Sequence, residues 1–153
     1  MKRITALIVV VSVLVPSLAL AVDGDKAMYV GGTMTGVKEK AEGPLDTKDE
    51  TAIAFTTKKD GSLSIPYASI TGLEYGQKAG RRVAVAVLVS PLALFSKKRK
   101  HYLTISFNDA AGKEQAAVFE LGKEIVRTTL TIVETRSGKK IDYQDEEARK
   151  AGR

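Results

Sequence analysis

The sequence Thr51-Ala-Ile-Ala-Phe-Thr-Thr57 alternates between apolar and polar residues, and Asp60-Gly61 follows it closely. A second alternating stretch then covers 62–66. In a strand with this alternation, Ile53 and Phe55 lie on the same face of the sheet. Asp-Gly between two such stretches is a strong signal for a tight turn. We therefore predict a β-hairpin formed by 51–57 and 62–66.

Alternation of the same kind recurs over 102–107 and 117–121, on either side of the turn-rich sequence 108–112. These stretches predict a second hairpin. Further extended segments are expected at 28–30, 43–47 and 70–75. Repeated short strands separated by polar turns are typical of an antiparallel sandwich or barrel.

The stretch 122–137 has a different periodicity, because its apolar residues recur at helical spacing. Glu124 suits the first turn of a helix and Gly138 suits its end. The β-branched residues of 128–135 favour a strand instead. We predict a helix at about 123–137. The alternative is an eight-stranded lipocalin-like barrel in which 124–134 is a strand.

The composition is that of an ordinary globular protein, with 44% hydrophobic and 27% charged residues among 153, which is enough chain for one domain. The sequence has no cysteine and one histidine. Disulfides, thiol catalysis and cysteine-ligated metals are therefore excluded, as is any site that needs two histidines.

Residues 1–21 have the three parts of a secretory signal peptide. Lys2 and Arg3 form a basic start, 4–15 is an apolar run, and Ala19-Leu20-Ala21 matches a cleavage site. The apolar run is shorter than the roughly 20 residues that cross a bilayer as a helix, although an uncleaved anchor is the alternative. We expect cleavage after Ala21 and export to the periplasm or the exterior, either free or peripheral on a membrane.

The mature chain is expected to form a single domain over 22–141. A charged tail follows over 142–153, and its composition gives it little apolar surface to bury. We therefore predict that this tail is flexible, either a frayed helix or disordered.

Positive charge is concentrated between residues 75 and 108. This stretch has seven basic residues and no acidic one, whereas the rest of the chain after residue 21 has 15 basic and 18 acidic residues. Anionic phospholipid headgroups or an acidic envelope protein are the expected partners of such a surface. The predicted interaction surface consists of Lys78, Arg81, Arg82, Phe95, Lys97, Lys98, Arg99 and Lys100.

Within this basic stretch, 83–95 contains no charged residue. Its alternating valines suit a buried strand, with 97–100 in a solvated loop. A bend at Ser90-Pro91 would instead let the segment dip into an anionic membrane while its basic flanks stay with the headgroups. Docking of a protein is a third interpretation. As a helix, 83–95 would span only about 20 Å, which is too short to cross a bilayer.

The sequence shows no constellation of residues for catalysis. His101 has no second histidine or cysteine for a metal site, and the basic stretch offers it no carboxylate as an orienting partner. Aromatic stacking residues and known motifs for nucleic-acid binding are also missing. We expect no enzymatic activity, no cofactor, no metal and no nucleic-acid partner.

Several residues occur in the order found in one known family: Gly43-x-Leu45, Phe55, Ile65-Pro66-Tyr67-x-x-Ile70 and Leu73. Over about 43–137 the chain resembles the GRAM and bacterial PH branch of the PH-like superfold. The resemblance implies a mainly β fold, a two-sheet antiparallel barrel or sandwich of about seven strands capped by one C-terminal α-helix. It also implies a noncatalytic module that binds lipid headgroups or protein segments. The alternative is a small secreted interaction protein with a lipocalin-like barrel that binds an apolar ligand.

Overall fold

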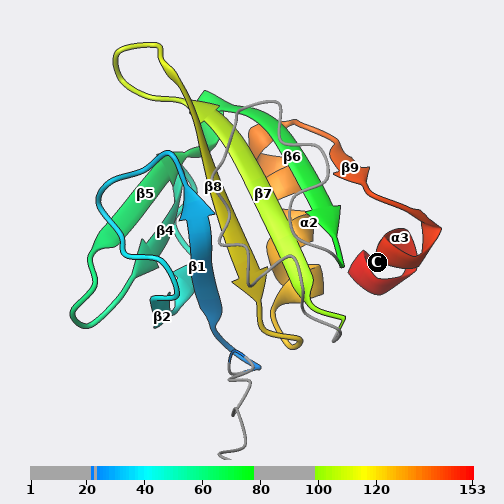
Figure 1. Ribbon diagram of the computed structural model, residues 1–153. Coiled ribbons are helices and arrows are strands. Elements are labelled where there is room, and N and C mark those ends of the chain that lie inside the picture. Colours follow the sequence, from blue (N-terminus) through cyan, green and yellow to red (C-terminus); the bar gives the residue numbers. More distant parts are fainter. Residues whose placement is uncertain (1–21, 23, 78–98) are drawn as a thin grey trace, which may run out of the picture.

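The computed structural model describes residue 22 and the ranges 24–77 and 99–153. Its fold is mainly β and contains two separate sheets that do not close into a barrel (Figure 1). The strands are β1 (Ala27–Gly32), β2 (Glu42–Gly43), β3 (Leu45–Asp46), β4 (Ala52–Thr56), β5 (Ser62–Pro66), β6 (Ile70–Gly76), β7 (His101–Asn108), β8 (Glu114–Leu121) and β9 (Ile141–Tyr143). The helical elements are η1 (Tyr67–Ser69), α2 (Val126–Ser137) and α3 (Glu146–Gly152).

The larger sheet has the strand order β2-β1-β8-β7-β6-β9, and the smaller has the order β3-β4-β5. All pairs are antiparallel except β6 with β9. The described chain thus has nine strands rather than about seven, and three of them are only two or three residues long. Such short strands give almost no alternation in the sequence, so the pattern could not reveal them.

Both predicted hairpins are confirmed. In the first, Ile53 lies opposite Ile65 and Phe55 opposite Leu63, and all four side chains are buried. The strands are joined by a loop, 57–61, that is longer than a two-residue turn. The Thr57 N–H donates to the Gly61 carbonyl across this loop at 3.0 Å. In the second hairpin, β7 and β8 pair along their whole length.

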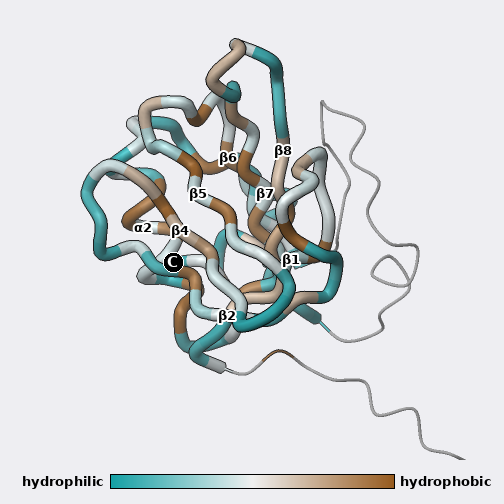
Figure 2. Tube along the Cα trace, turned by 90° about the vertical axis from the view of Figure 1, so that its left-hand side faces the viewer, coloured by the Kyte–Doolittle hydropathy of each residue, from teal (hydrophilic) through white to brown (hydrophobic). Residues whose placement is uncertain are grey.

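The core lies between the two sheets, where the apolar residues of β4, β5, β7 and α2 gather (Figure 2). Phe119 of β8 contacts Tyr29 of β1 with ring centroids 5.7 Å apart. It also contacts Phe55 of the smaller sheet at 5.3 Å. One aromatic side chain therefore joins the larger sheet to the smaller one.

The predicted helix is confirmed as α2, so the lipocalin-like alternative with a strand at 124–134 is wrong. Gly138 ends the helix in the left-handed conformation with φ 67°, and its N–H donates to the Glu134 carbonyl. The buried side of α2 consists of Val126, Thr129, Leu130 and Val133. Burial of this stripe outweighs the strand preference of the β-branched residues, which is a weak preference.

The structure corrects the prediction of a flexible tail, because residues 142–153 are folded against the larger sheet. β9 extends that sheet by parallel pairing with β6, and α3 follows it with Ala148 fully buried. Asp145 caps α3 by accepting a hydrogen bond from the Ala148 N–H at 2.7 Å. The buried residues of α3 are the small Ala148 and Gly152, and Tyr143 is the one large ring of 142–153 that packs on the core, so the composition resembles that of a solvated segment.

Two predicted features lie outside the described residues: the signal peptide at 1–21, and the apolar segment 83–95 with most of its basic flanks. None of the helices within the described ranges combines the length and the apolar composition that crossing a bilayer requires.

Leu130 provides a test of the packing of α2, since its side chain is 1% exposed. We expect Leu130→Asp to lower the free energy of unfolding by roughly 3 kcal/mol or more, because it buries an unpaired charge. Thr131→Asp on the exposed side of the same helix is the matched control and should cost less than about 0.5 kcal/mol. Urea unfolding measures both; equal small losses would contradict the packing of this helix face.

Candidate functional site

The structure describes only two of the eight residues predicted for the basic surface, Arg99 and Lys100. Lys78, Arg81, Arg82, Phe95, Lys97 and Lys98 lie outside the described residues. Arg99 is 3.2 Å from Glu147 of α3, and both side chains are largely exposed. This pair contributes little to stability because solvent screens it.

Lys100 is engaged inside the fold. Its Nζ lies 2.9 Å from Oε2 of Glu120, and the two side chains are 19% and 4% exposed. Glu120 is opposite Tyr102 in the pairing of β7 with β8. Burial, and secondarily the Glu120 carboxylate, raise the pKa of Tyr102 to about 12. Lys100 thus neutralises a buried carboxylate and presents little surface to an external ligand.

The charge of the described chain is balanced, since it contains 17 basic and 17 acidic residues. The formal net charge of +6 therefore comes from outside the described residues. Lys2, Arg3 and the five basic residues of 78–98 supply this excess. An anionic partner attracted to the folded body must use a local grouping of cations.

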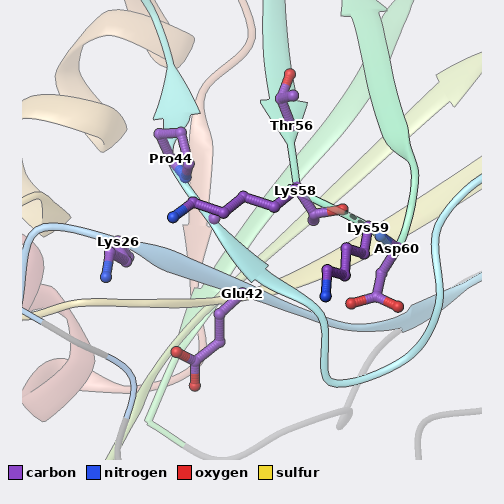
Figure 3. A pocket seen from close by; sticks show the side chains of 9 residues that line it. Lys26, Glu42, Pro44, Thr56, Lys58, Lys59 and Asp60 are labelled. Atoms are coloured by element: carbon purple, nitrogen blue, oxygen red, sulfur yellow. Dashed lines mark hydrogen bonds between the residues drawn. The ribbon is translucent and has the colours of Figure 1, made fainter.

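One such grouping lines an open cleft of about 730 Å³ between β2 and the loop that joins β4 to β5. Lys26 and Glu42 stand on one side, and Lys58, Lys59 and Asp60 come from the loop (Figure 3). Lys58 extends along the cleft toward Pro44 in this view. We name these lining residues the lysine cleft: Lys26, Glu42, Gly43, Pro44, Thr56, Thr57, Lys58, Lys59 and Asp60.

The loop of the lysine cleft is held in place by its own hydrogen bonds. The Thr57 hydroxyl donates to the Gly61 carbonyl at 2.7 Å and accepts from the Asp60 N–H at 2.8 Å. Gly43 of β2 lies close to the end of β4, since a side chain at this position would meet the Thr56 carbonyl oxygen at 2.1 Å. Lys58 and Lys59 are therefore presented from a defined loop.

Some charged residues of the lysine cleft form ion pairs with described residues and others do not. Asp60 forms an ion pair with Lys38 at 3.3 Å. Lys58 and Lys59 are exposed, and neither forms an ion pair with a described residue. Two adjacent cations at the mouth of a cleft suit an anionic group, which they attract by charge and by hydrogen bonds from their ammonium groups.

The lysine cleft is not among the sites that the sequence predicts. Lys58 and Lys59 directly precede the Asp60-Gly61 turn signal, which places them at a hairpin end. Lys26 is more than 30 residues away in the sequence, and only the arrangement of the two sheets brings it to the same cleft. A single sequence contains no signal for that proximity.

His101 opens β7 and bonds to a tyrosine rather than to a carboxylate. Its Nδ1 lies 2.5 Å from the hydroxyl of Tyr75 on β6, and the two rings are nearly parallel with centroids 6.2 Å apart. Burial of the ring, followed by the nearby Lys123 ammonium, lowers the pKa of His101, while Glu120 acts in the opposite direction. This environment keeps the ring neutral at pH 7.

No group of three or more His, Asp or Glu side chains within the described ranges is placed to hold a metal ion. The chain matches no protein-family model, and no curated protein is significantly similar to it. The lysine cleft and the His101–Tyr75 pair are therefore interpreted from their geometry alone.

The structural role of Lys100 can be tested by removing one member of its pair. Lys100→Met leaves the Glu120 carboxylate buried without a partner, so we expect a loss of roughly 3 kcal/mol in the free energy of unfolding. Lys100→Met combined with Glu120→Leu should recover most of that loss, since neither charge remains. Thermal unfolding at pH 7 measures both variants. If the single variant were as stable as the wild type, Lys100 would be free to act as a surface ligand.

Proposed function

We propose that this protein is an exported, noncatalytic binding module whose partner is anionic, either a phospholipid headgroup or the acidic side chains of an envelope protein. The observation that carries the proposal is the pair Lys58 and Lys59, which lie at the mouth of the lysine cleft without a described ion-pair partner. A neutral folded body with a local cationic site favours recognition of a specific anionic group over general adhesion.

The scaffold we propose is PH-like. Two antiparallel sheets and a helix that packs its apolar stripe over the core support this proposal. The parallel strand β9 and the helix α3 are additions to such a scaffold. The space between the sheets is filled by large buried side chains, including Tyr29, Phe55 and Phe119. This packing favours a surface ligand over an apolar ligand held inside a barrel.

The basic segment 78–98 is a second contributor to the same function. It carries five basic residues and no acidic residue, next to a described chain with no net charge. Each lysine or arginine near an anionic membrane surface contributes about 1 kcal/mol, and salt weakens this attraction. The lysine cleft and this segment can therefore act together on an extended anionic surface.

Reversing the charges of the lysine cleft tests the proposal. We expect Lys58→Glu with Lys59→Glu to weaken binding to phosphatidylglycerol-containing vesicles at least roughly 30-fold, which corresponds to about 1 kcal/mol for each lysine. Vesicle co-sedimentation at low salt measures the effect, and polyglutamate serves as the probe for an acidic polypeptide.

The matched control is Lys139→Glu with Lys140→Glu, which makes the same change of charge at two adjacent exposed lysines after α2. Its binding should remain within a few-fold of the wild type if the effect is local. Equal losses in both double variants would mean that only net charge matters. A loss seen solely in Lys97→Glu with Lys98→Glu would move the site from the lysine cleft to the basic segment.

Export is tested separately from binding. N-terminal sequencing of the protein recovered from the cell envelope should begin at Val22, because Ala19-Leu20-Ala21 has the small residues that signal peptidase requires. A mature species that retains residues 1–21 would contradict this part of the proposal.

A further inference from the structure

The C-terminal elements β9 and α3 are held at one end of β6, chiefly by Tyr75. The Gln144 N–H donates to the Tyr75 carbonyl at 3.0 Å. The ring of Tyr143 meets the ring of Tyr75 edge-on, with centroids 5.9 Å apart. The Gln144 side-chain amide also donates to Glu74 at 3.1 Å. Figure 1 shows α3 beyond the β9 edge of the larger sheet.

The end of α3 approaches these rings very closely. A side chain at Gly152 would lie 2.9 Å from Leu130 Cδ1 and from Tyr143 Cε1, and 3.1 Å from Tyr75 Cε1. Such distances are too short for carbon atoms in contact, so glycine is needed for this fit. The position of α3 is thus sensitive to small changes around Tyr75.

His101 connects this contact to a cavity. Its Nδ1 bonds to the Tyr75 hydroxyl, and its ring also lines a cavity of about 380 Å³. Ala151 of α3 forms one wall, opposite residues from the start of α2 and the preceding loop. The cavity is lined by His101, Lys123, Glu124, Val126, Arg127 and Ala151. The cavity is already partly open and His101 is half-buried, so moving α3 would remove one wall and expose the histidine further.

We propose that β9 and α3 form a C-terminal latch that is closed on Tyr75 while His101 is neutral and is released when His101 becomes protonated. The latch is defined as residues 141–152. It shares no lining residue with the lysine cleft, so it is a device separate from the proposed binding site.

The chemistry of the His101–Tyr75 bond explains why protonation opposes closure. In the neutral ring, Nδ1 can accept the hydrogen of the Tyr75 hydroxyl. After protonation both ring nitrogens carry hydrogens, so Nδ1 can only donate. No other described residue bonds to the hydroxyl of Tyr75, whose side chain is fully buried. The protonated Nδ1–H can still donate to the hydroxyl oxygen, but the hydroxyl hydrogen is then left without an acceptor among the described residues, and an unpaired buried donor is costly.

On balance, the charged residues around His101 also disfavour its protonation while the latch is closed. Lys123 and Arg127 line its cavity together with Glu124, Lys100 precedes it in the chain, and Glu120 approaches from β8. Because Lys100 already pairs with Glu120, that carboxylate gives a protonated ring limited compensation. A positive charge on His101 is better tolerated when α3 has moved away and water enters.

The latch is the element that can respond, since β7 itself is held on both sides. β7 pairs with β8 over eight residues and with β6 on its other side. β9 pairs with β6 over only three residues, and no strand of the described ranges lies beyond it. Local opening occurs where contacts are few, so the cost of protonation is relieved at 141–152 before the sheet opens.

The sign of the pH dependence follows from the depressed pKa of His101. The closed state binds the proton more weakly than the open state does. The closed population therefore falls as the pH drops through the range in which a free histidine titrates, and it is fully restored above that range.

Hydrogen exchange of the whole mature protein tests the latch. Between about pH 7.5 and about pH 5.5, the range that brackets a histidine, protection of the Gln144 and Arg149 amides should fall at least about fivefold. Protection of the Leu103 and Phe119 amides should stay constant. His101→Asn places an amide oxygen near Nδ1 without a titrating group, and it should abolish the pH response. A response that persists in His101→Asn, or that affects Phe119 equally, would overturn the proposal.

A reciprocal experiment does not depend on the folding of any His101 variant. Gly152→Ala should force the latch open by collision with Leu130 and Tyr143. Linkage then requires the pKa of His101, followed by NMR of the ring, to rise toward the free-histidine value. Lys150→Gln on the exposed side of α3 is the control and should leave that pKa unchanged. If Gly152→Ala opens the latch, as seen by loss of protection at Gln144, and the pKa does not move, the proposal is wrong.

Discussion

The contact of Phe119 with Phe55 is the interaction on which the two-sheet arrangement depends. Phe119 belongs to β8 and Phe55 to β4, and their ring centroids are 5.3 Å apart. Both side chains are 1% exposed, and full burial of such a side chain contributes about 1.5–3 kcal/mol. Because the smaller sheet and the larger sheet do not close into a barrel, packing across this interface holds them together. It therefore fixes the lysine cleft, whose walls come from both sheets.

The predictable part of the fold is the part with a long repeating pattern. The hairpins β4–β5 and β7–β8 follow from alternation, and α2 follows from its helical stripe and from Gly138. The docking of β9 and α3 has little signal in the sequence for a physical reason: β9 is only three residues long, and α3 docks through the small residues Ala148 and Gly152. Close approach of small residues is a property of the fold that no local periodicity expresses.

The candidate site illustrates a different limit of sequence reasoning. Charge segregation correctly locates where the chain has excess positive charge, but it does not show which cations are already paired. Arg99 and Lys100 belong to the same basic run, yet Lys100 is held against buried Glu120 while Arg99 lies at the surface beside Glu147. Counting charges along the sequence does not single out Lys58 and Lys59, because the acidic Asp60 follows them. Pairing in space, rather than density along the chain, determines which charge is available to a ligand.

The described residues at 75–76 and 99–102 lie at the edge of the larger sheet where the proposed latch docks. Gly76 and Tyr102 are paired between β6 and β7 at this edge. Tyr75 and His101 flank this pair diagonally, one on each strand, and form the bond to which the proposed latch responds. Glu147 of α3 contacts Arg99 at the same place. Arg99, the first described residue after 78–98, is thus already paired with the acidic start of α3.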